Sequence, residues 1–262
     1  MNFLKILFQN RKMVLKLGRN DFRNRYANAS LGALWGFLQP FVFMITYVIV
    51  FQYIMHTGSA GNYPYSVWFL PGMAIWMFCN DAIMQASNSI RIYSYLVKKV
   101  VFPVDVIPVI TLVSSSFIGL FLLLIATVVG IAFGYPPNVL NLLYIILCVY
   151  CFIIAFTRFT SALTTLVPDF AQLLAIAMQL FMWFTPIVWS LGMIEGKIVV
   201  LFKAMPFTYL VEGMRQAFID SSTIITEHHG LYTIVFWSIT VFLFVFGNHV
   251  FKKSKKDFAD VL

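Results

Sequence analysis

The chain has 262 residues, of which 61% are hydrophobic and only 11% are charged, and it carries a net charge of +8. Soluble domains have about 45–50% apolar and about 25% charged residues, so this composition excludes an ordinary soluble fold and indicates an integral membrane protein. A basic charge also occurs in nucleic-acid-binding proteins. Here the Lys and Arg residues lie beside long apolar runs, where such charges set membrane orientation.

Six apolar stretches are long enough to cross a bilayer as helices, which takes about 20 residues each. In chain order the predicted spans are Leu34–Met55, Tyr65–Ser87, Val104–Phe133, Leu140–Leu163, Gln172–Leu191 and Leu231–Val250. The expected fold is an all-α integral membrane protein with six transmembrane helices. We divide the chain into an amphipathic cytoplasmic interface helix (residues 1–33), a transmembrane domain (34–250) and a basic cytoplasmic tail (251–262).

Two segments outside the spans are also predicted to be helical. In residues 1–33, apolar residues recur at roughly helical spacing with Lys and Arg between them, which is typical of a helix lying in the membrane interface. Membrane anchoring and a gating or partner-binding role are equally compatible with this helix. The connection 192–230 is too apolar for an exposed loop. We expect two short external helices there that dip back toward the bilayer, because unpaired backbone is not tolerated at that depth.

The distribution of basic residues predicts the orientation of the chain. All but three of the 18 Lys and Arg residues fall on one side of the predicted spans, the exceptions being Lys197, Lys203 and Arg215. By the positive-inside rule both termini are therefore cytoplasmic. Arg158, near the inner end of the fourth span, is expected to snorkel to the interface.

The chain has no sequence signature of an enzyme. It lacks the G-x-x-x-x-G-K-[ST] loop that wraps nucleotide phosphates, and its four His residues have no metal-ligand spacing with carboxylates. Cys148 and Cys151 have C-x-x-C spacing but lie in an apolar span without further ligands, so packing is their expected role. We predict no catalytic, cofactor-binding or metal site, and an energy source outside this chain.

Aromatic residues make up 18% of the chain and are concentrated in the first and fifth predicted spans. Aromatic faces suit a sugar chain because they offer apolar contact, although packing or lipid contact explains any single ring more simply. Pro40 and Pro186 are candidate flex points in these spans, since proline loosens a helix locally; purely structural kinks are equally open. The candidate path-lining residues are Trp35, Phe37, Phe41, Tyr47, Phe181, Trp183, Phe184 and Trp189.

Two further features point to function. The second span is the most polar and contains Asp81. Intramembrane ionisable groups face water or the bundle interior. We therefore expect Asp81 either to face a wet vestibule or to have a structural partner. The segment Ile90–Pro108 is cytoplasmic by the charge count and semi-apolar. We expect a short helix there that docks into a partner's groove, with contact to the bilayer surface as the alternative.

Five segments, in this order, resemble the ABC-2 type permeases that export polysaccharides, above all the teichoic acid export permeases of Gram-positive bacteria. The resemblance extends over nearly the whole chain. One departure is that Pro168 precedes Asp169 where the family typically has an Arg-Asp pair. The segments are Arg25–Pro40 (RYANASLGALWGFLQP), Ser87–Ser114 (SNSIRIYSYLVKKVVFPVDVIPVITLVS), Phe184–Trp189 (FTPIVW), Pro206–Arg215 (PFTYLVEGMR) and Lys256–Leu262 (KDFADVL).

The resemblance implies a homodimer in the bacterial plasma membrane with two ABC ATPase subunits, which would bind ATP and Mg. The substrate would be teichoic acid linked to undecaprenyl diphosphate, with O-antigen, capsular polysaccharide or another lipid-linked substrate as alternatives. A membrane enzyme would need clustered carboxylates, and a passive channel would need no ATPase. The implied ATPase-coupling residues are Tyr93, Tyr95, Leu96, Lys98, Lys99 and Phe102.

Overall fold

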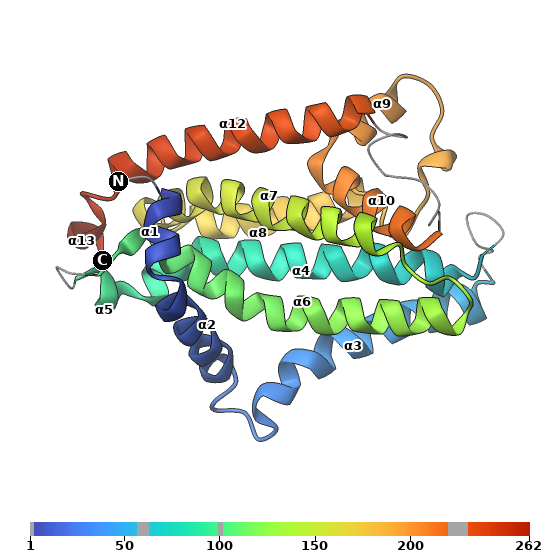
Figure 1. Cartoon of the computed structure of the whole chain (residues 1–262), viewed down its shortest axis with the longest axis horizontal. Coiled ribbons are helices and arrows are strands. Elements are labelled where there is room, and N and C mark those ends of the chain that lie inside the picture. Colours follow the sequence, from blue (N-terminus) through green and yellow to red (C-terminus); the bar gives the residue numbers. More distant parts are fainter. Residues whose placement is uncertain (1–2, 57–62, 99–101, 220–229) are drawn as a thin grey trace.

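The computed structural model describes residues 3–56, 63–98, 102–219 and 230–262, and within them all regular structure is helical. The predicted all-α membrane fold is confirmed. Figure 1 shows long helices side by side, with α9 and α10 at one end of the bundle and both termini at the other. The helices are α1 (Phe3–Gln9), α2 (Arg11–Arg25), α3 (Trp35–Val48), α4 (Tyr65–Ile92), α5 (Ser94–Val97), α6 (Ile107–Ala132), α7 (Val139–Leu166), α8 (Phe170–Phe184), α9 (Ile198–Ala204), α10 (Pro206–Ile219), α12 (Gly230–Ser254) and α13 (Phe258–Val261).

Five helical segments in the described part of the chain are long and apolar enough to cross a membrane. They correspond to five of the six predicted spans. The predicted span over Gln172–Leu191 is represented by α8, which has only 15 residues. The five segments are Gly32–Ile54, Tyr65–Ile92, Val104–Ala132, Val139–Leu166 and Gly230–Ser254.

The early end of α8 corrects two expectations. The helix does not continue to Leu191, and Pro186 lies in the turn that follows the helix, outside any path-lining helix. The reason is local: a proline disfavours helical backbone in the residue before it, and Thr185 is extended, with φ −78° and ψ 133°. Pro40, in contrast, lies inside α3 as expected.

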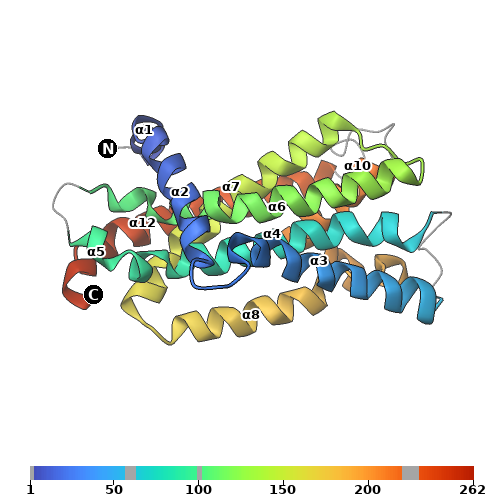
Figure 2. The ribbon, with the colours of Figure 1, turned by 90° about the horizontal axis from the view of Figure 1, so that it is seen from below.

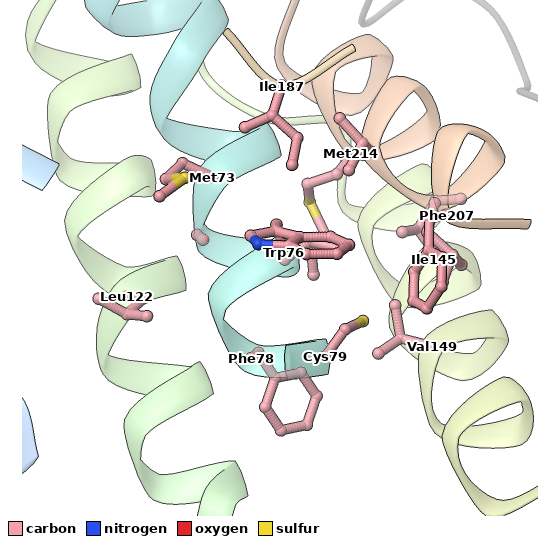
Figure 3. Packing of buried hydrophobic residues seen from close by; sticks show 14 of the residues in the cluster. Met73, Trp76, Phe78, Cys79, Leu122, Ile145, Val149, Ile187, Phe207 and Met214 are labelled. Atoms are coloured by element: carbon pink, nitrogen blue, oxygen red, sulfur yellow. The ribbon is translucent and has the colours of Figure 1, made fainter. Parts of the chain in front are cut away.

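Helix α4 forms the centre of the bundle. Its apolar window is the least hydropathic of the five, yet 78% of that window is buried, against 11% for the segment containing α3. Figure 3 shows Met73, Trp76 and Cys79 of α4 packed among side chains from neighbouring helices. The most polar span is therefore enclosed by protein, as is expected where polar side chains lie inside a membrane.

The N-terminal segment forms two helices where one was expected, and α2 packs closely on α6. A Cβ atom added to Gly18 of α2 would lie 2.6 Å from Cγ1 of Val113, so only a glycine allows this approach. Val14, Asp21 and Phe22 of α2 are also buried. Beyond α8, helices α9 and α10 supply the two short helices predicted for the connection to the last span.

Candidate functional site

A partly polar cavity of about 350 Å³ lies between α3, α4, α6 and α8. Figure 2 shows the setting, with α3 and α8 on one side of α4 and α6 on the other. Gln39, Asn80 and Asp81 contribute polar side chains to a wall that is otherwise largely apolar. The lining also includes Tyr26, Gly36, Pro40, Phe43, Met73, Trp76, Met77, Ile118 and Met182.

The eight predicted path residues do not line this cavity, although they lie on or just after the two helices that flank it. Phe37 and Phe41 pack on the ring of Phe121, with centroids 5.0 and 6.4 Å away. Tyr47 stacks on Phe69 at 5.6 Å, and Phe181 lies 5.3 Å from Phe207. These four rings hold α3 and α8 to the bundle.

The other predicted path residues are more accessible. Trp35 is 42% exposed, Trp183 62% and Phe184 49%. Trp189 is half-buried and donates its indole N–H to the backbone carbonyl of Trp183 at 3.0 Å. The aromatic pattern thus identifies the two helices beside the cavity, while the residues that line it are different and more polar.

Arg25 of α2 connects three helices beside this cavity. Its guanidinium pairs with Asp21 at 3.0 Å and with Asp81 of α4 at 3.2 Å, and it donates to the backbone carbonyl of Thr111 on α6 at 3.2 Å. Asp81 therefore has the structural partner that one of its two expectations named, and it also lines the cavity. No ion pair was predicted for Arg25, although an acid four residues before a basic residue on a helix was a usable signal.

The predicted coupling residues divide between two faces of the segment around α5. Tyr93 and Leu96 are buried, whereas Tyr95 is 58% exposed and Lys98 is exposed. Phe102 is half-buried, and Lys99 lies outside the described residues. Among the predicted coupling residues that the structure describes, Tyr95 and Lys98 are the exposed ones.

The buried face of the coupling segment is joined to the Arg25 cluster. The Tyr93 hydroxyl donates a hydrogen bond of 2.5 Å to the Asp21 carboxylate. Burial, and then this hydrogen bond, raise the pKa of Tyr93, so the hydroxyl keeps its proton. A continuous set of polar contacts therefore runs from Tyr93 through Asp21 and Arg25 to Asp81 at the cavity wall.

A second cluster surrounds Arg158 of α7 and corrects the snorkelling expectation. Arg158 is 1% exposed. It pairs with Asp105 at 3.1 Å and donates to Asn248 of α12 at 2.7 Å. The rings of Phe3 and Phe251 lie 4.4 and 4.0 Å from the guanidinium carbon. The buried carboxylate of Asp105 pairs with this charge, so the side chain has no need to reach the interface.

A third cluster surrounds Arg215 of α10 at the opposite end of the bundle. Arg215 is 1% exposed and lies 3.6 Å from the ring centroid of Trp68 on α4. It pairs with Glu212 at 2.7 Å and donates to the backbone carbonyls of Pro186 and Ile187 in the turn after α8. Arg215 thus fixes α10 and this turn to α4, a role that its count as an external charge did not reveal.

Sequence comparison identifies the family. The profile of the ABC-2 type transporter family matches residues 14–219, which is most of the chain. The chain belongs to this family. It is a multi-pass membrane protein of the ABC-2 type.

Two curated relatives match almost end to end. One is the O-antigen export system permease protein RfbA of Myxococcus xanthus, 22% identical over 97% of this chain and 96% of its own length. The other is the protein of the same name from Klebsiella pneumoniae, 22% identical over 95% of each chain. The similarity is thus to permeases, which are transport subunits. Both names specify O-antigen, whereas the sequence analysis put teichoic acid first.

Proposed function

We propose that this chain is the membrane subunit of an ATP-driven exporter for a lipid-linked polysaccharide of the O-antigen type. The observation that carries the proposal is the similarity over at least 95% of the chain to two permeases of O-antigen export systems. The partly polar cavity beside α4 supports it, because a hydroxyl-rich chain crossing a membrane needs polar contacts away from lipid. Teichoic acid is the second candidate, favoured by the five sequence segments that resemble teichoic acid permeases.

In the proposed mechanism, two copies of the chain act with two copies of a separate ABC ATPase, which binds ATP and Mg. The end of the bundle that holds both termini and α5 faces the cytoplasm, as the Lys and Arg distribution predicts. Tyr95 of α5 and Lys98, directly after this helix, are exposed and meet the ATPase. Closure of the ATPase dimer on ATP moves α5, and the buried contact of Tyr93 with Asp21 passes this motion to α2 and α4.

The proposed path for the polymer runs beside α3 and α8. The segment containing α3 is largely uncovered, with 11% of its apolar window buried, and Trp183 and Phe184 of α8 are exposed. In the proposed dimer these faces meet the second copy, and the aromatic residues of both helices border the polymer. Pro40 gives α3 a site at which it can bend.

A reconstitution experiment tests the function. The purified chain and its candidate ATPase are placed in proteoliposomes, lipid-linked O-polysaccharide or teichoic acid is loaded on the ATPase side, and polymer on the other side is measured. ATP-dependent appearance of O-polysaccharide is expected. Transfer of teichoic acid alone would reverse the order of the two substrates, and no ATP dependence with either would refute the exporter.

A matched pair of variants tests the coupling surface in the same assay. Tyr95→Ala is expected to lower co-purification of the ATPase and transport together. Tyr53→Ala removes an equally exposed tyrosine, at 62% exposure against 58% for Tyr95, and is expected to keep ATPase binding. An ATPase that binds Tyr95→Ala as tightly as the unmodified chain would contradict the docking role.

A further inference from the structure

The uncovered residues of α4 form one stripe. Of the 28 residues in this helix all but eight are buried, and the eight recur every three or four positions, so that they share one face. They occupy only the part of α4 from Met77 to its end at Ile92, which leads to α5. The α4 stripe consists of Met77, Asn80, Asp81, Met84, Gln85, Asn88, Arg91 and Ile92.

Every residue of the α4 stripe lines one of two cavities. Met77, Asn80 and Asp81 belong to the cavity between α3, α4, α6 and α8 described above. The remaining five line a second cavity of about 790 Å³, which also touches Ser94, Thr165 and the C-terminal residue Leu262. The two cavities follow one another along α4, from the end of the bundle that holds both termini toward its middle.

The chemistry of the α4 stripe calls for a polar occupant. Within the described residues, the structure gives no hydrogen-bond partner to the side-chain amides of Asn80 and Gln85, and Asn88 uses its amide N–H only on the Met84 carbonyl of its own helix. Polar groups without partners are costly away from water. These amides therefore face water or a ligand rich in hydroxyl groups.

The charges along the α4 stripe distinguish its two ends. Asp81, at the deep end, shares the Arg25 guanidinium with Asp21, at 3.2 and 3.0 Å, so this end has no excess positive charge to hold an anion. Arg91, at the outer end, is exposed and has no acidic partner among the residues that the structure describes. A neutral sugar chain fits the deep end, and an acidic group such as a phosphate fits the end at Arg91.

We propose that the α4 stripe binds the hydroxyl groups of the exported polysaccharide in the inner half of the membrane, while Arg91 binds an acidic group of the same substrate at the mouth. This inference rests on the proposed function and adds a contact surface to it. The eight aromatic path residues predicted on or just after α3 and α8 line neither cavity, so the α4 stripe supplies the hydrogen bonds that those rings lack.

Cysteine labelling tests the inference without relying on transport. In a chain whose three native cysteines are replaced by alanine, single variants Asn80→Cys, Gln85→Cys and Asn88→Cys are assembled with the ATPase in proteoliposomes. A charged, membrane-impermeant maleimide added on the ATPase side is expected to label all three, and lipid-linked O-polysaccharide is expected to slow the labelling.

Two control positions show where the reagent should not react. Leu124→Cys on α6 is 61% exposed on an apolar face and should stay unlabelled because hydrocarbon excludes the charged reagent. Ser87→Cys lies on α4 at a fully buried position and should also stay unlabelled. Absence of labelling at all three stripe positions in the assembled complex would mean that a second copy covers the stripe, which would overturn the proposal.

Transport by substituted chains tests the binding role. Gln85→Met keeps the length of the side chain but removes its hydrogen bonds, and it is expected to lower the transport rate. Gln9→Met makes the same chemical change on α1 and should not. Arg91→Gln should raise the substrate concentration needed for half-maximal transport, and Arg91→Lys should restore it. Retained co-purification of the ATPase shows that the variants are assembled.

The outcomes separate the two proposals. If the unmodified complex transports and Gln85→Met and Arg91→Gln match it, the exporter stands and the α4 stripe is not its binding surface. If the unmodified complex does not transport, the proposed function fails. In that case, labelling of the stripe that is insensitive to the polysaccharide refutes the inference as well.

Discussion

Neutralising Asp105 is expected to destabilise the bundle strongly, because Arg158 would lose its buried counter-ion. The Asp105 side chain is 7% exposed and that of Arg158 is 1% exposed. Arg158 donates both to the Asp105 carboxylate at 3.1 Å and to its backbone carbonyl at 3.2 Å. The Asp105→Asn variant keeps the shape and one acceptor but removes the charge. Removal of one partner of a buried ion pair costs about 3–5 kcal/mol.

Lys255 provides the internal comparison, because it binds the same carboxylate from a more open position. The Lys255 side chain is 40% exposed, and an exposed pair contributes only about 0–1 kcal/mol. Lys255→Met should therefore have a small effect. The double variant Asp105→Asn/Arg158→Met removes both members of the buried pair and is expected to recover more than half of the lost stability, since the only charge left without its partner is that of the partly exposed Lys255.

The assay is equilibrium unfolding in mixed micelles with increasing sodium dodecyl sulfate, followed by tryptophan fluorescence. The free energies of unfolding of the three variants are compared with that of the unmodified chain. The reasoning would be refuted if Asp105→Asn cost no more than Lys255→Met, or if the double variant were less stable than Asp105→Asn.

Three further variants test other contacts. Gly247→Ala puts a Cβ 3.0 Å from the backbone nitrogen of Phe159 and should lower the free energy of unfolding by about 1–3 kcal/mol. Gly192→Ala is the control, because the nearest atom to its Cβ is 3.7 Å away, and it should leave the stability unchanged. Equal free energies of unfolding for the two variants would contradict the close packing of α12 on α7. Pro40→Ala should stabilise α3 by up to about 3 kcal/mol and slow transport in proteoliposomes; an unchanged rate would refute a bending role for Pro40. Tyr93→Phe loses a hydrogen bond to a carboxylate, worth about 1.5–3 kcal/mol, and should lower the polymer exported per ATP hydrolysed. Because burial and that hydrogen bond raise the pKa of Tyr93, this loss should be the same at neutral and mildly alkaline pH, and a loss confined to one pH would argue against a neutral donor.

The membrane helices were predictable because apolar length is a local property of the sequence. The end of α8 also had a local signal, since Pro186 restricts the residue before it, but the apolar run beyond the proline outweighed it in the sequence analysis. The burial of Arg158 had no such local signal. Its partners Asp105 and Asn248 are 53 and 90 residues away along the chain, and only the folded bundle brings them together.

The candidate site was predicted at the level of helices and not of residues. Aromatic content indicated the helices α3 and α8. The sequence does not distinguish a ring that packs inward, as Phe37 does, from one that is exposed, as Trp183 is. The coupling segment shows the same limit, because Tyr93 is buried and Tyr95 is exposed although they are two residues apart and their ring centroids are separated by 6.0 Å. Burial decides between such neighbours, and burial depends on which helix lies alongside.

The shortness of α8 has a consequence for the lipid around the protein. Its 15 residues span about 22 Å at 1.5 Å per residue, whereas the hydrocarbon layer is about 30 Å thick. The following residues Thr185, Pro186 and Ile187 are buried in protein, so they do not extend the apolar surface offered to lipid. A bilayer meets such a mismatch by thinning locally. The membrane beside α8 should therefore be thinnest next to the cavity, where the head group of the proposed lipid-linked substrate would have the shortest hydrophobic distance to cross.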